Sequence, residues 1–396
     1  MSRINWTPNQ FKTKSNLQHL THDFDKETLS KAKNFHASIP GYEPTPLHNL
    51  TSLANKLSVQ NIYIKDESQR FGLNAFKPLG GSYAMAEYLA DKVNLDLNDS
   101  DFKTLMGSVK NLETETFATV TAGNHGKGVA WAAQSFKQTS NVYLPKGSSE
   151  ERLKAIQELG ANAEIIDMNY DDAVIHIAAE AEKNGWVLIQ DTAWEGYDAI
   201  PLDVMKGYST IVAEILEQLS KEDLNDITHV ILQAGVGSFA AAVAASIYNQ
   251  RMDNPPTFII AEPSKADCLY QSAKTDTGEP ERVHGDLDSM MAGLACGEPS
   301  PIAWRILKPM TDAFFSCTDD VSAEGMRILS APKGNDPKII SGESGALPIG
   351  VLNELITNHG LKRAKDALKL NNDSNILIIN TEGDTNPENY QRIVNK

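Results

Sequence analysis

The chain has 396 residues, which is more than one hydrophobic core usually serves, so we expect two domains. Asp and Glu outnumber Lys and Arg by 52 to 36, and a net charge of −16 argues against the basic surface of a nucleic-acid-binding protein. The sequence contains no apolar run near the ~18 residues of a membrane helix and starts without the pattern of a signal peptide, so we expect a cytoplasmic protein without a membrane partner.

The three cysteines, Cys268, Cys296 and Cys317, do not form a C-x-x-C pair. A zinc site is therefore not expected, and no metal is assigned. In a reducing compartment these residues are most simply buried thiols. The spacing does not decide whether Cys268 and Cys296 form a disulfide.

Strand-like apolar runs alternate with helix-like amphipathic runs along the chain. Strands are expected at residues 117–120, 141–144, 163–167, 186–189, 228–232, 257–260 and 375–379. Helices are expected at residues 126–136, from a Ser149 cap to Gly160, at 171–183, from Pro201 onward, and at 239–248. This alternation predicts an α/β fold of parallel sheets covered by helices, in which ligands bind at loops after the carboxyl ends of strands.

The first such loop contains Lys77 in the segment NAFKPLGGS, residues 74–82. Alone, a lysine on a glycine-flanked loop is usually just solvated. Here Pro78 stiffens the turn, Gly80 and Gly81 permit close backbone approach, and Ser82 offers a hydroxyl. A lysine held in this way is typical of an amine that forms an imine with a carbonyl compound.

The next loop, TAGNHG at residues 121–126, again lies between a strand and a helix. Asn124 can donate a hydrogen bond to a phenolate-type oxygen of a ligand. His125 at the start of the helix is a candidate catalytic group, although a histidine there is more often a structural hydrogen-bonding residue.

A third loop, QAGVGSFA at residues 233–240, follows a predicted strand and opens an alanine-rich helix. Gly235 and Gly237 leave backbone amides accessible, and the helix N-terminus favours an anion such as phosphate. The same loop also fits the dinucleotide pattern G-x-G-x-x-A, with Glu262 placed as a ribose-binding acid. By itself, the loop therefore leaves three readings open: a nicotinamide or flavin cofactor, a different phosphate-bearing cofactor, or only tight packing between the strand and the helix.

The last loop is TEGDT at residues 381–385, after the final predicted strand. Thr381 offers a neutral hydroxyl, which would leave a pyridine nitrogen largely unprotonated. A polar turn is the plainer reading of this segment alone.

Taken in this order, the loops resemble the fold-type II pyridoxal-phosphate enzymes, the group of threonine dehydratase and tryptophan synthase β. The resemblance covers residues 44–385 and is closest to the diaminopropionate ammonia-lyase family. The similar segments are residues 71–82 (FGLNAFKPLGGS), 123–126 (GNHG), 191–197 (DTAWEGY), 265–270 (KADCLY), 291–299 (MAGLACGEP), 341–346 (SGESGA) and 381–385 (TEGDT). It implies two parallel-rich twisted sheets covered by helices.

The resemblance also implies pyridoxal 5′-phosphate as the cofactor, with Lys77 as its Schiff-base lysine and Asp191 as a second catalytic residue. Other expected cofactor contacts are Phe76, Asn124, Gly235, Val236, Gly237, Ser238 and Thr381. Expected substrate contacts are Ser82, Ala122, Gly123 and His125. The family reaction converts 2,3-diaminopropionate to pyruvate and ammonia through an aldimine and an aminoacrylate, and its members are typically homodimers.

One departure from the family pattern concerns Ala122, where the family usually has an aspartate before Gly-Asn-His-Gly. Serine and threonine dehydratases commonly have a small residue there, so a dehydratase or a catalytically weakened variant stays open as an alternative. A non-catalytic binder of the cofactor is less expected, because every cofactor loop is present. Lys77 and Asp191 are both candidates for the base that removes the α-proton, although Asp191 also fits a structural cap.

For the domains, we expect a small inserted domain at residues 84–205. The large cofactor-binding domain would then comprise residues 1–83 and 206–396.

Overall fold

The computed structural model describes residues 2–121 and 123–396, and the chain divides into two compact units. The larger unit contains the chain up to Lys26, Pro44–Ala75 and Ile211–Lys396. The smaller unit contains Glu27–Glu43 and Phe76–Thr210. Each unit has its own sheet.

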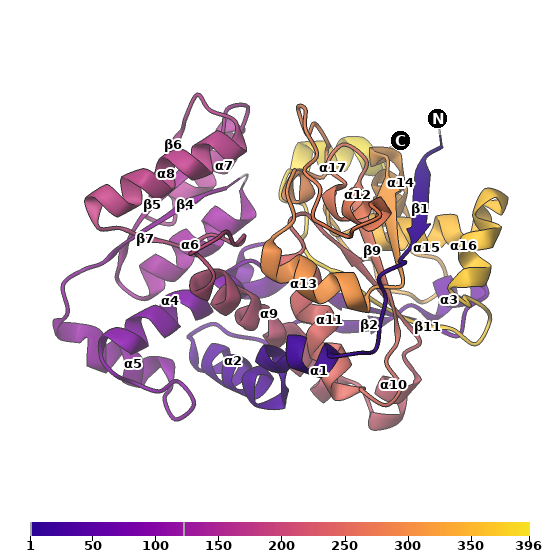
Figure 1. Ribbon diagram of the computed structural model, residues 1–396, viewed down its shortest axis with the longest axis horizontal. Helices are drawn as coiled ribbons and strands as arrows, with labels where there is room; N and C mark the ends of the chain where they lie inside the picture. The colour runs from indigo at the N-terminus through magenta and orange to yellow at the C-terminus, as the bar shows by residue number, and fades with distance from the viewer. Residues whose placement is uncertain (1, 122) are drawn as a thin grey trace. The chain divides into compact units, whose positions relative to one another are not determined.

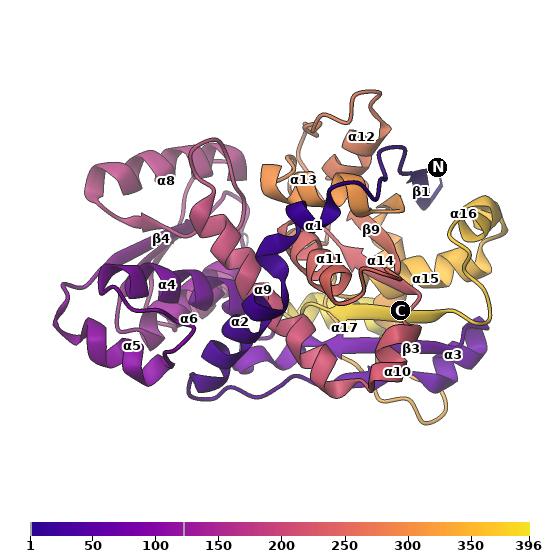
Figure 2. The same ribbon diagram turned by 60° about the horizontal axis from the view of Figure 1, so that its bottom comes forward.

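The larger unit is built around a seven-stranded sheet in the order β1-β10-β9-β8-β11-β3-β2. Of these strands, β1, β2, β9 and β11 are labelled in Figure 1 and β3 in Figure 2. Its strands are β1 (Ile4–Pro8), β2 (Leu47–Asn49), β3 (Asn61–Asp66), β8 (His229–Gln233), β9 (Thr257–Pro263), β10 (Ala313–Cys317) and β11 (Asn375–Asn380). The five inner strands pair in parallel, whereas β1 and β2 are antiparallel to their neighbours at the two edges. The inner strands therefore release their following loops at one edge of the sheet.

Helices surround this sheet. They are α1 (Leu17–Leu20), α3 (Thr51–Leu57), α10 (Lys221–Asp226), α11 (Ser238–Gln250), α12 (Cys268–Lys274), α13 (Pro301–Met310), α14 (Asp319–Ser330), α15 (Leu347–Thr357), α16 (Lys362–Ala367) and α17 (Pro387–Val394), with short 3-10 turns at His22–Phe24, Glu67–Gly72, Ala292–Leu294 and His359–Leu361. One face of the sheet packs Ile231, Ile259 and Ile378 into a core with apolar residues of α15. Nearly continuous burial of the inner strands is what a parallel sheet covered on both faces requires.

The smaller unit has a four-stranded sheet, β6-β5-β4-β7, in which all strands are parallel. Its elements are α2 (Lys26–Ser38), α4 (Pro78–Lys92), α5 (Phe102–Ser108), a 3-10 turn at Val109–Asn111, β4 (Thr116–Val120), α6 (Asn124–Ser135), β5 (Thr139–Leu144), α7 (Glu150–Gln157), β6 (Asn162–Ile165), α8 (Tyr170–Asn184), β7 (Val187–Leu188) and the first part of α9 (Ala199–Gln218). The predicted α/β architecture of two parallel-rich sheets is confirmed.

Most predicted elements lie within a few residues of their observed bounds. The Ser149 cap of α7 is confirmed, because its hydroxyl accepts a hydrogen bond from the Arg152 amide. The start of α9 is corrected, because the helix begins at Ala199, two residues before Pro201. Sequence reasoning did not identify β1, β2, β3 or β10.

The compact smaller unit extends beyond residues 84–205. It includes Glu27–Glu43 because His36, buried in α2, hydrogen-bonds Thr210 at 2.7 Å and Ser82 at 3.1 Å. It includes the start of α4 because Gly81 packs against the backbone of Gly128 in α6. The expected domain edges at 84 and 205 stay a prediction.

A fully buried charge cluster ties β3 to the second half of α9 in the larger unit. The Arg70 guanidinium donates to Glu67 at 2.8 Å and to Glu214 at 2.7 and 2.9 Å. Lys65 Nζ donates to Glu214 and also to Thr45 and Gln218. The Lys65, Glu67, Arg70 and Glu214 side chains have no solvent exposure, so each charge depends on its partners.

Arg70→Met should destabilise the larger unit strongly, because it leaves the Glu67 and Glu214 carboxylates buried with too few partners. Breaking one side of a buried ion pair costs about 3–5 kcal/mol. The free energy of unfolding from urea titration measures this loss. Lys362→Met, which removes an exposed ion pair with Asp366, is the control and should change little. Equal effects for both variants would contradict the role given to the cluster.

Candidate functional site

Lys77 lies immediately before α4, where its backbone is held by close packing. Pro78 occupies the first turn of that helix, a position where proline is favoured. A side chain on Gly128 of α6 would come within 3.0 Å of the Lys77 carbonyl carbon and oxygen. A side chain on Gly80 would meet the Tyr208 ring at 2.6 Å. These two glycines let α4, α6 and α9 approach closely enough to fix the lysine.

The Lys77 side chain forms an ion pair with Asp191. The two side chains are 17% and 13% exposed, so the pair is largely desolvated but reachable from solvent. Phe76 and Tyr208 flank the amine, with ring centroids 5.2 and 5.9 Å from Nζ. The structure thus brings together three of the predicted residues, Lys77, Asp191 and Phe76, within the smaller unit.

The Asp191 carboxylate is kept ionised by this arrangement. Burial raises the pKa of Asp191, but the Lys77 ammonium more than offsets it, so the net pKa lies well below the usual range. While the ammonium stays beside it, Asp191 is therefore a counter-ion and a weak proton acceptor.

His125 lies beside this pair and has a defined tautomer. Its Nε2 is 2.9 Å from the Ile189 carbonyl oxygen, which only accepts, so Nε2 carries the hydrogen. Nδ1 is then an acceptor, 4.0 Å from Asp191 Oδ2. It is buried without a hydrogen-bond partner among the described residues. Burial lowers the pKa of His125, which keeps the ring neutral.

The loop that carries Asn124 is closed by Thr121. Its hydroxyl accepts hydrogen bonds from the Gly123 amide at 2.9 Å and the Gly126 amide at 3.1 Å. Asn124 is the first residue of α6 and is partly exposed. Ala122, predicted as a substrate contact, lies outside the described residues.

Ser82, also predicted as a substrate contact, is buried in α4. Its hydroxyl donates to the Pro78 carbonyl at 2.7 Å and lies 3.1 Å from His36 Nε2. These partners direct the hydroxyl into the helix packing. Its substrate role stays a prediction.

In the larger unit, residues 235–238 form a tight turn between β8 and α11, as predicted. Gly237 has φ +96°, which glycine adopts without strain. A side chain on Gly235 would lie 3.2 Å from Leu294 Cα and 3.3 Å from Cys296 Sγ. Ser238 opens the helix, which runs for 13 residues and so presents the amides of a full N-terminus.

Thr381 follows β11, the strand next to β8. Its hydroxyl accepts a hydrogen bond of 2.7 Å from Gln233 Nε2, and Gln233 also donates to the Ile379 carbonyl at 3.1 Å. Sequence reasoning gave Gln233 no role, and it also missed Tyr208. Their functions depend on contacts with residues far away along the chain, so no local pattern marks them.

The positions of Glu262 and the cysteines bear on the hypotheses of a dinucleotide site, a disulfide and a metal site. The buried Glu262 carboxylate accepts the amides of Leu269 and Tyr270 at 2.8 and 2.7 Å, so it caps α12 instead of facing a ribose. None of the three cysteines forms a disulfide. Over the described residues, no His, Cys, Asp and Glu side chains cluster in a way that could hold a metal ion.

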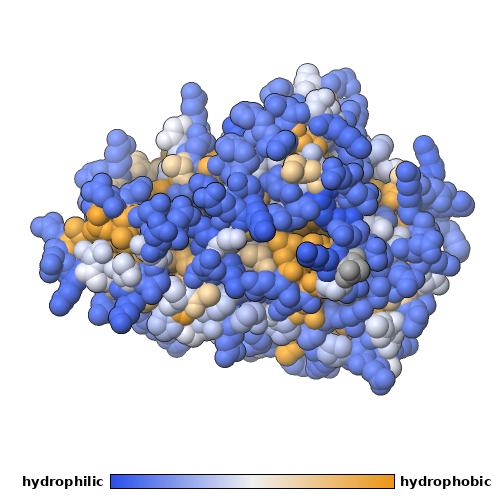
Figure 3. Space-filling model, turned by 90° about the horizontal axis from the view of Figure 1, so that it is seen from below, coloured by the Kyte–Doolittle hydropathy of each residue, from blue (hydrophilic) through white to orange (hydrophobic). Residues whose placement is uncertain are grey.

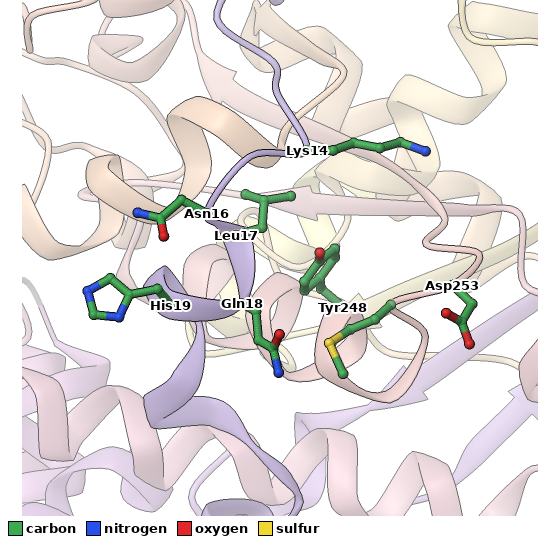
Figure 4. A pocket seen from close by; sticks show the side chains of 8 residues that line it. Lys14, Asn16, Leu17, Gln18, His19, Tyr248 and Asp253 are labelled. Carbon is green, nitrogen blue, oxygen red and sulfur yellow. The ribbon is translucent and has the colours of Figure 1, made fainter.

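A separate hollow of about 700 Å³ lies in the larger unit (Figure 4). Lys14 and residues 16–19 line it, together with Tyr248, Met252 and Asp253 at and after the end of α11. It contains none of the predicted site residues. The hollow therefore has no part in the site described above.

Comparison with known proteins identifies the family. Residues 39–382 match the family described as "Pyridoxal-phosphate dependent enzyme". A diaminopropionate ammonia-lyase from Salmonella typhimurium is 49% identical over 91% of this chain and 90% of its own length. The chain belongs to the diaminopropionate ammonia-lyase family of pyridoxal-phosphate dependent enzymes.

Solved structures from this family have the same fold as this chain. The holo diaminopropionate ammonia-lyase of Escherichia coli has a TM-score of 0.90 and 45% identity, covering 99% of this chain and 96% of that one. The same enzyme in complex with an aminoacrylate-PLP azomethine reaction intermediate has a TM-score of 0.88 and 44% identity, covering 100% and 97%. The prediction of the fold-type II architecture is confirmed, and the alternatives of a dehydratase or a non-catalytic binder are not favoured.

The residues present fit the cofactor of the diaminopropionate ammonia-lyase family. A phosphate group is favoured at a helix N-terminus that follows glycines, and Gly235 and Gly237 lie directly before α11. An imine needs a reachable amine, which Lys77 supplies at 17% side-chain exposure. A pyridine nitrogen needs a hydrogen-bonding partner, and the Thr381 hydroxyl is a group of that kind.

His125 should stay neutral at pH values where an ordinary histidine gains a proton. Its pKa is lowered from about 6.5 by burial, so protonation in the folded protein should begin only below that pH. NMR of ¹⁵N-histidine-labelled protein measures both the tautomer and the titration. His125→Gln assigns the signal. A folded-state pKa above 6.5, or a hydrogen on Nδ1, would contradict this assignment.

The same shift has a consequence for stability. The unfolded chain takes up a proton that folded His125 does not, so the free energy of unfolding should fall as the pH drops below about 6.5.

Proposed function

We propose that this chain converts 2,3-diaminopropionate and water to pyruvate and two ammonia molecules, with Lys77 and Asp191 as its central catalytic residues. The observation that carries the proposal is the Lys77–Asp191 ion pair with the neutral, acceptor-bearing His125 beside it. A lyase acting on a substrate with two amino groups needs an amine that can exchange with one of them. It also needs anionic or accepting groups for the other.

The cofactor would be held by the residues that the family pattern assigns to it. Lys77 would bond covalently to it, with Phe76 against the ring and Asn124 at the ring hydroxyl. The amides of Gly235, Val236 and Gly237, with Ser238, would hold the phosphate, and Thr381 would face the ring nitrogen. When bound, pyridoxal phosphate joins the substrate's α-amine and withdraws electrons from its α-carbon.

Lys77 is the better candidate for the base that removes the α-proton. The amine becomes an ammonium when it accepts the proton, and the adjacent Asp191 carboxylate stabilises that charge. Asp191 itself has a strongly lowered pKa beside the ammonium, so it is a poor proton acceptor there. We therefore assign proton transfer to Lys77 and charge balance to Asp191.

Asp191 and His125 also provide a basis for substrate selection. The Asp191 carboxylate and His125 Nδ1 are both acceptors, 4.0 Å apart. A β-ammonium group brings three donors and a positive charge, whereas a β-hydroxyl brings one donor and no charge. When Lys77 is engaged with the cofactor, a cationic substrate would restore the partner that the buried carboxylate needs.

Among the predicted substrate contacts, His125 thus has the best-defined chemistry. The Gly123 amide already donates to Thr121, and the Ser82 hydroxyl donates within α4. Roles for Ser82, Gly123 and Ala122 are part of the proposal and rest on the family pattern alone.

We also propose a cytoplasmic homodimer, as the family resemblance implies. Across the described residues, no helix is long and apolar enough to cross a membrane. Hydrophilic residues cover most of the face in Figure 3, in keeping with the net charge of −16. Neither nucleic acid nor membrane is a proposed partner.

The proposed reaction predicts pyruvate formation from diaminopropionate at a rate well above that from serine or threonine. Pyruvate, or the corresponding oxo acid from threonine, can be measured with L- and D-diaminopropionate, serine and threonine as separate substrates. A large preference for serine or threonine over both diaminopropionates would make the ammonia-lyase assignment wrong. Borohydride reduction followed by peptide mass spectrometry should place the trapped cofactor on Lys77. A label elsewhere would disprove its role independently of substrate choice.

Asp191→Asn should lower kcat/KM for diaminopropionate by up to about 10²–10⁴, because it removes the counter-ion of Lys77 and a positioned acid-base group contributes that much. The amide cannot balance the charge of an ammonium, so the loss for diaminopropionate should exceed any loss for serine. The exposed Asp198→Asn variant is the matched control and should keep wild-type kinetics. Equal losses with both substrates would argue that Asp191 has only a structural role.

A further inference from the structure

Parallel pairing of β8 and β11 places Gln233 and Thr381 side by side in the larger unit. Ile378 is opposite Ile231 in the register, so both strands end level with each other. Gln233 ends β8, and Thr381 is the first residue after β11. Both are buried, with 1% and 4% exposure, so their hydrogen bonds are protected from competition by water.

The orientation of the Gln233 amide follows from its partners. Nε2 lies 3.1 Å from the Ile379 carbonyl oxygen, which can only accept, so the atom there must be the amide NH₂ group. Its second hydrogen is donated to Thr381 Oγ1 at 2.7 Å. The flipped amide would place two acceptors against each other at Ile379. Gln233 Oε1 is buried without a partner in the described part of the chain, so only the two hydrogen bonds of the NH₂ group fix the orientation.

The Thr381 hydroxyl is consequently polarised in one direction. It accepts from Gln233, whose two amide hydrogens are both used, so it cannot donate back. Over residues 2–121 and 123–396, no acceptor takes the Thr381 hydrogen. The Thr381 oxygen therefore accepts from Gln233, and the Thr381 hydrogen is available to donate to another group.

We propose that Gln233 is a positioning residue that makes Thr381 an obligate hydrogen-bond donor to the cofactor's ring nitrogen. This inference rests on the proposed function, because it requires pyridoxal phosphate at Thr381. A nitrogen that accepts a hydrogen bond has its lone pair available and is unprotonated. Gln233 thus sets the protonation state of the ring without touching it, and with it the strength of the electron withdrawal.

Gln233→Glu tests the inference by reversing this polarity. An ionised glutamate has only acceptors, and a protonated one that donates to Ile379 still turns an acceptor to Thr381. Thr381 would then donate to residue 233 and turn its oxygen toward the ring. ¹⁵N NMR of enzyme loaded with ring-¹⁵N pyridoxal phosphate should show an unprotonated nitrogen in the wild type and a protonated one in the variant.

Two further variants distinguish a reversed hydrogen-bond direction at residue 233 from the effects of added charge and of impaired folding. Gln391→Glu makes the same charge change at an exposed position and should leave the nitrogen signal unchanged. Gln233→Met removes the donor without adding an acceptor. It should keep the nitrogen unprotonated and weaken cofactor binding by about two- to tenfold, the effect of one neutral hydrogen bond. If Gln233→Glu does not fold, the inference is still tested by the protonation state of the nitrogen in the wild type and by the cofactor affinity of Gln233→Met.

The outcomes distinguish this inference from the proposed function. Absence of cofactor absorbance in the loaded wild type would reject the function itself. Bound cofactor with a protonated ring nitrogen in the wild type would overturn the inference alone. An unprotonated nitrogen in Gln233→Glu would do the same, as would unchanged cofactor affinity in Gln233→Met.

Discussion

Parallel pairing between neighbouring strands is the constraint on which the polar arrangements in both units depend. Neighbouring parallel strands end at the same edge of a sheet, so the residues that follow them meet although they are far apart in sequence. Pairing of β4 with β7 brings His125 to the Ile189 carbonyl and Asp191. Pairing of β8 with β11 brings Gln233 to Thr381. Slipping either pair by two residues would move these groups apart by about 7 Å.

Burial distinguishes the lysine that can react from the one that cannot. Lys65 has no solvent exposure, and its three hydrogens are donated to Thr45, Glu214 and Gln218. Burial lowers the pKa of Lys65, yet its amine is enclosed and saturated with acceptors. Lys77 is 17% exposed and pairs with Asp191, which is itself 13% exposed. A lowered pKa alone would choose the wrong lysine, whereas solvent access to the amine chooses Lys77.

The sequence predicted those features whose signal is local. Apolar runs marked the inner strands β8, β9 and β11, and Ser149 marked the start of α7. The glycine loops were found because their spacing between strand and helix is itself the signal. Strand β3 was missed because Lys65 and Asp66 make its end look polar. Lys65 is compensated by Glu214, which is 149 residues away.

The functional residues likewise fall into two groups: those marked by a local sequence pattern and those defined only by tertiary contacts. Asn124 and Thr381 come shortly after predicted strands, and Lys77 is marked by the proline and glycines that follow it. Gln233 and Tyr208 carry no local mark, because the role of each is set by a neighbour from another element. Tertiary contacts of this kind require the register of the sheet or the packing of a helix, which composition and periodicity do not specify.

Hydrogen-bond direction, more than residue identity, gives each polar group its chemistry. A histidine can donate or accept at either nitrogen, but the Ile189 carbonyl leaves His125 Nδ1 as an acceptor. A threonine hydroxyl can do both, but Gln233 leaves Thr381 as a donor. In each case a backbone carbonyl, which can only accept a hydrogen bond, orients the first side chain. That side chain then determines whether the next polar group donates or accepts. Because both carbonyls belong to the ends of parallel strands or to the residue that follows, the fold itself sets the direction of these hydrogen bonds.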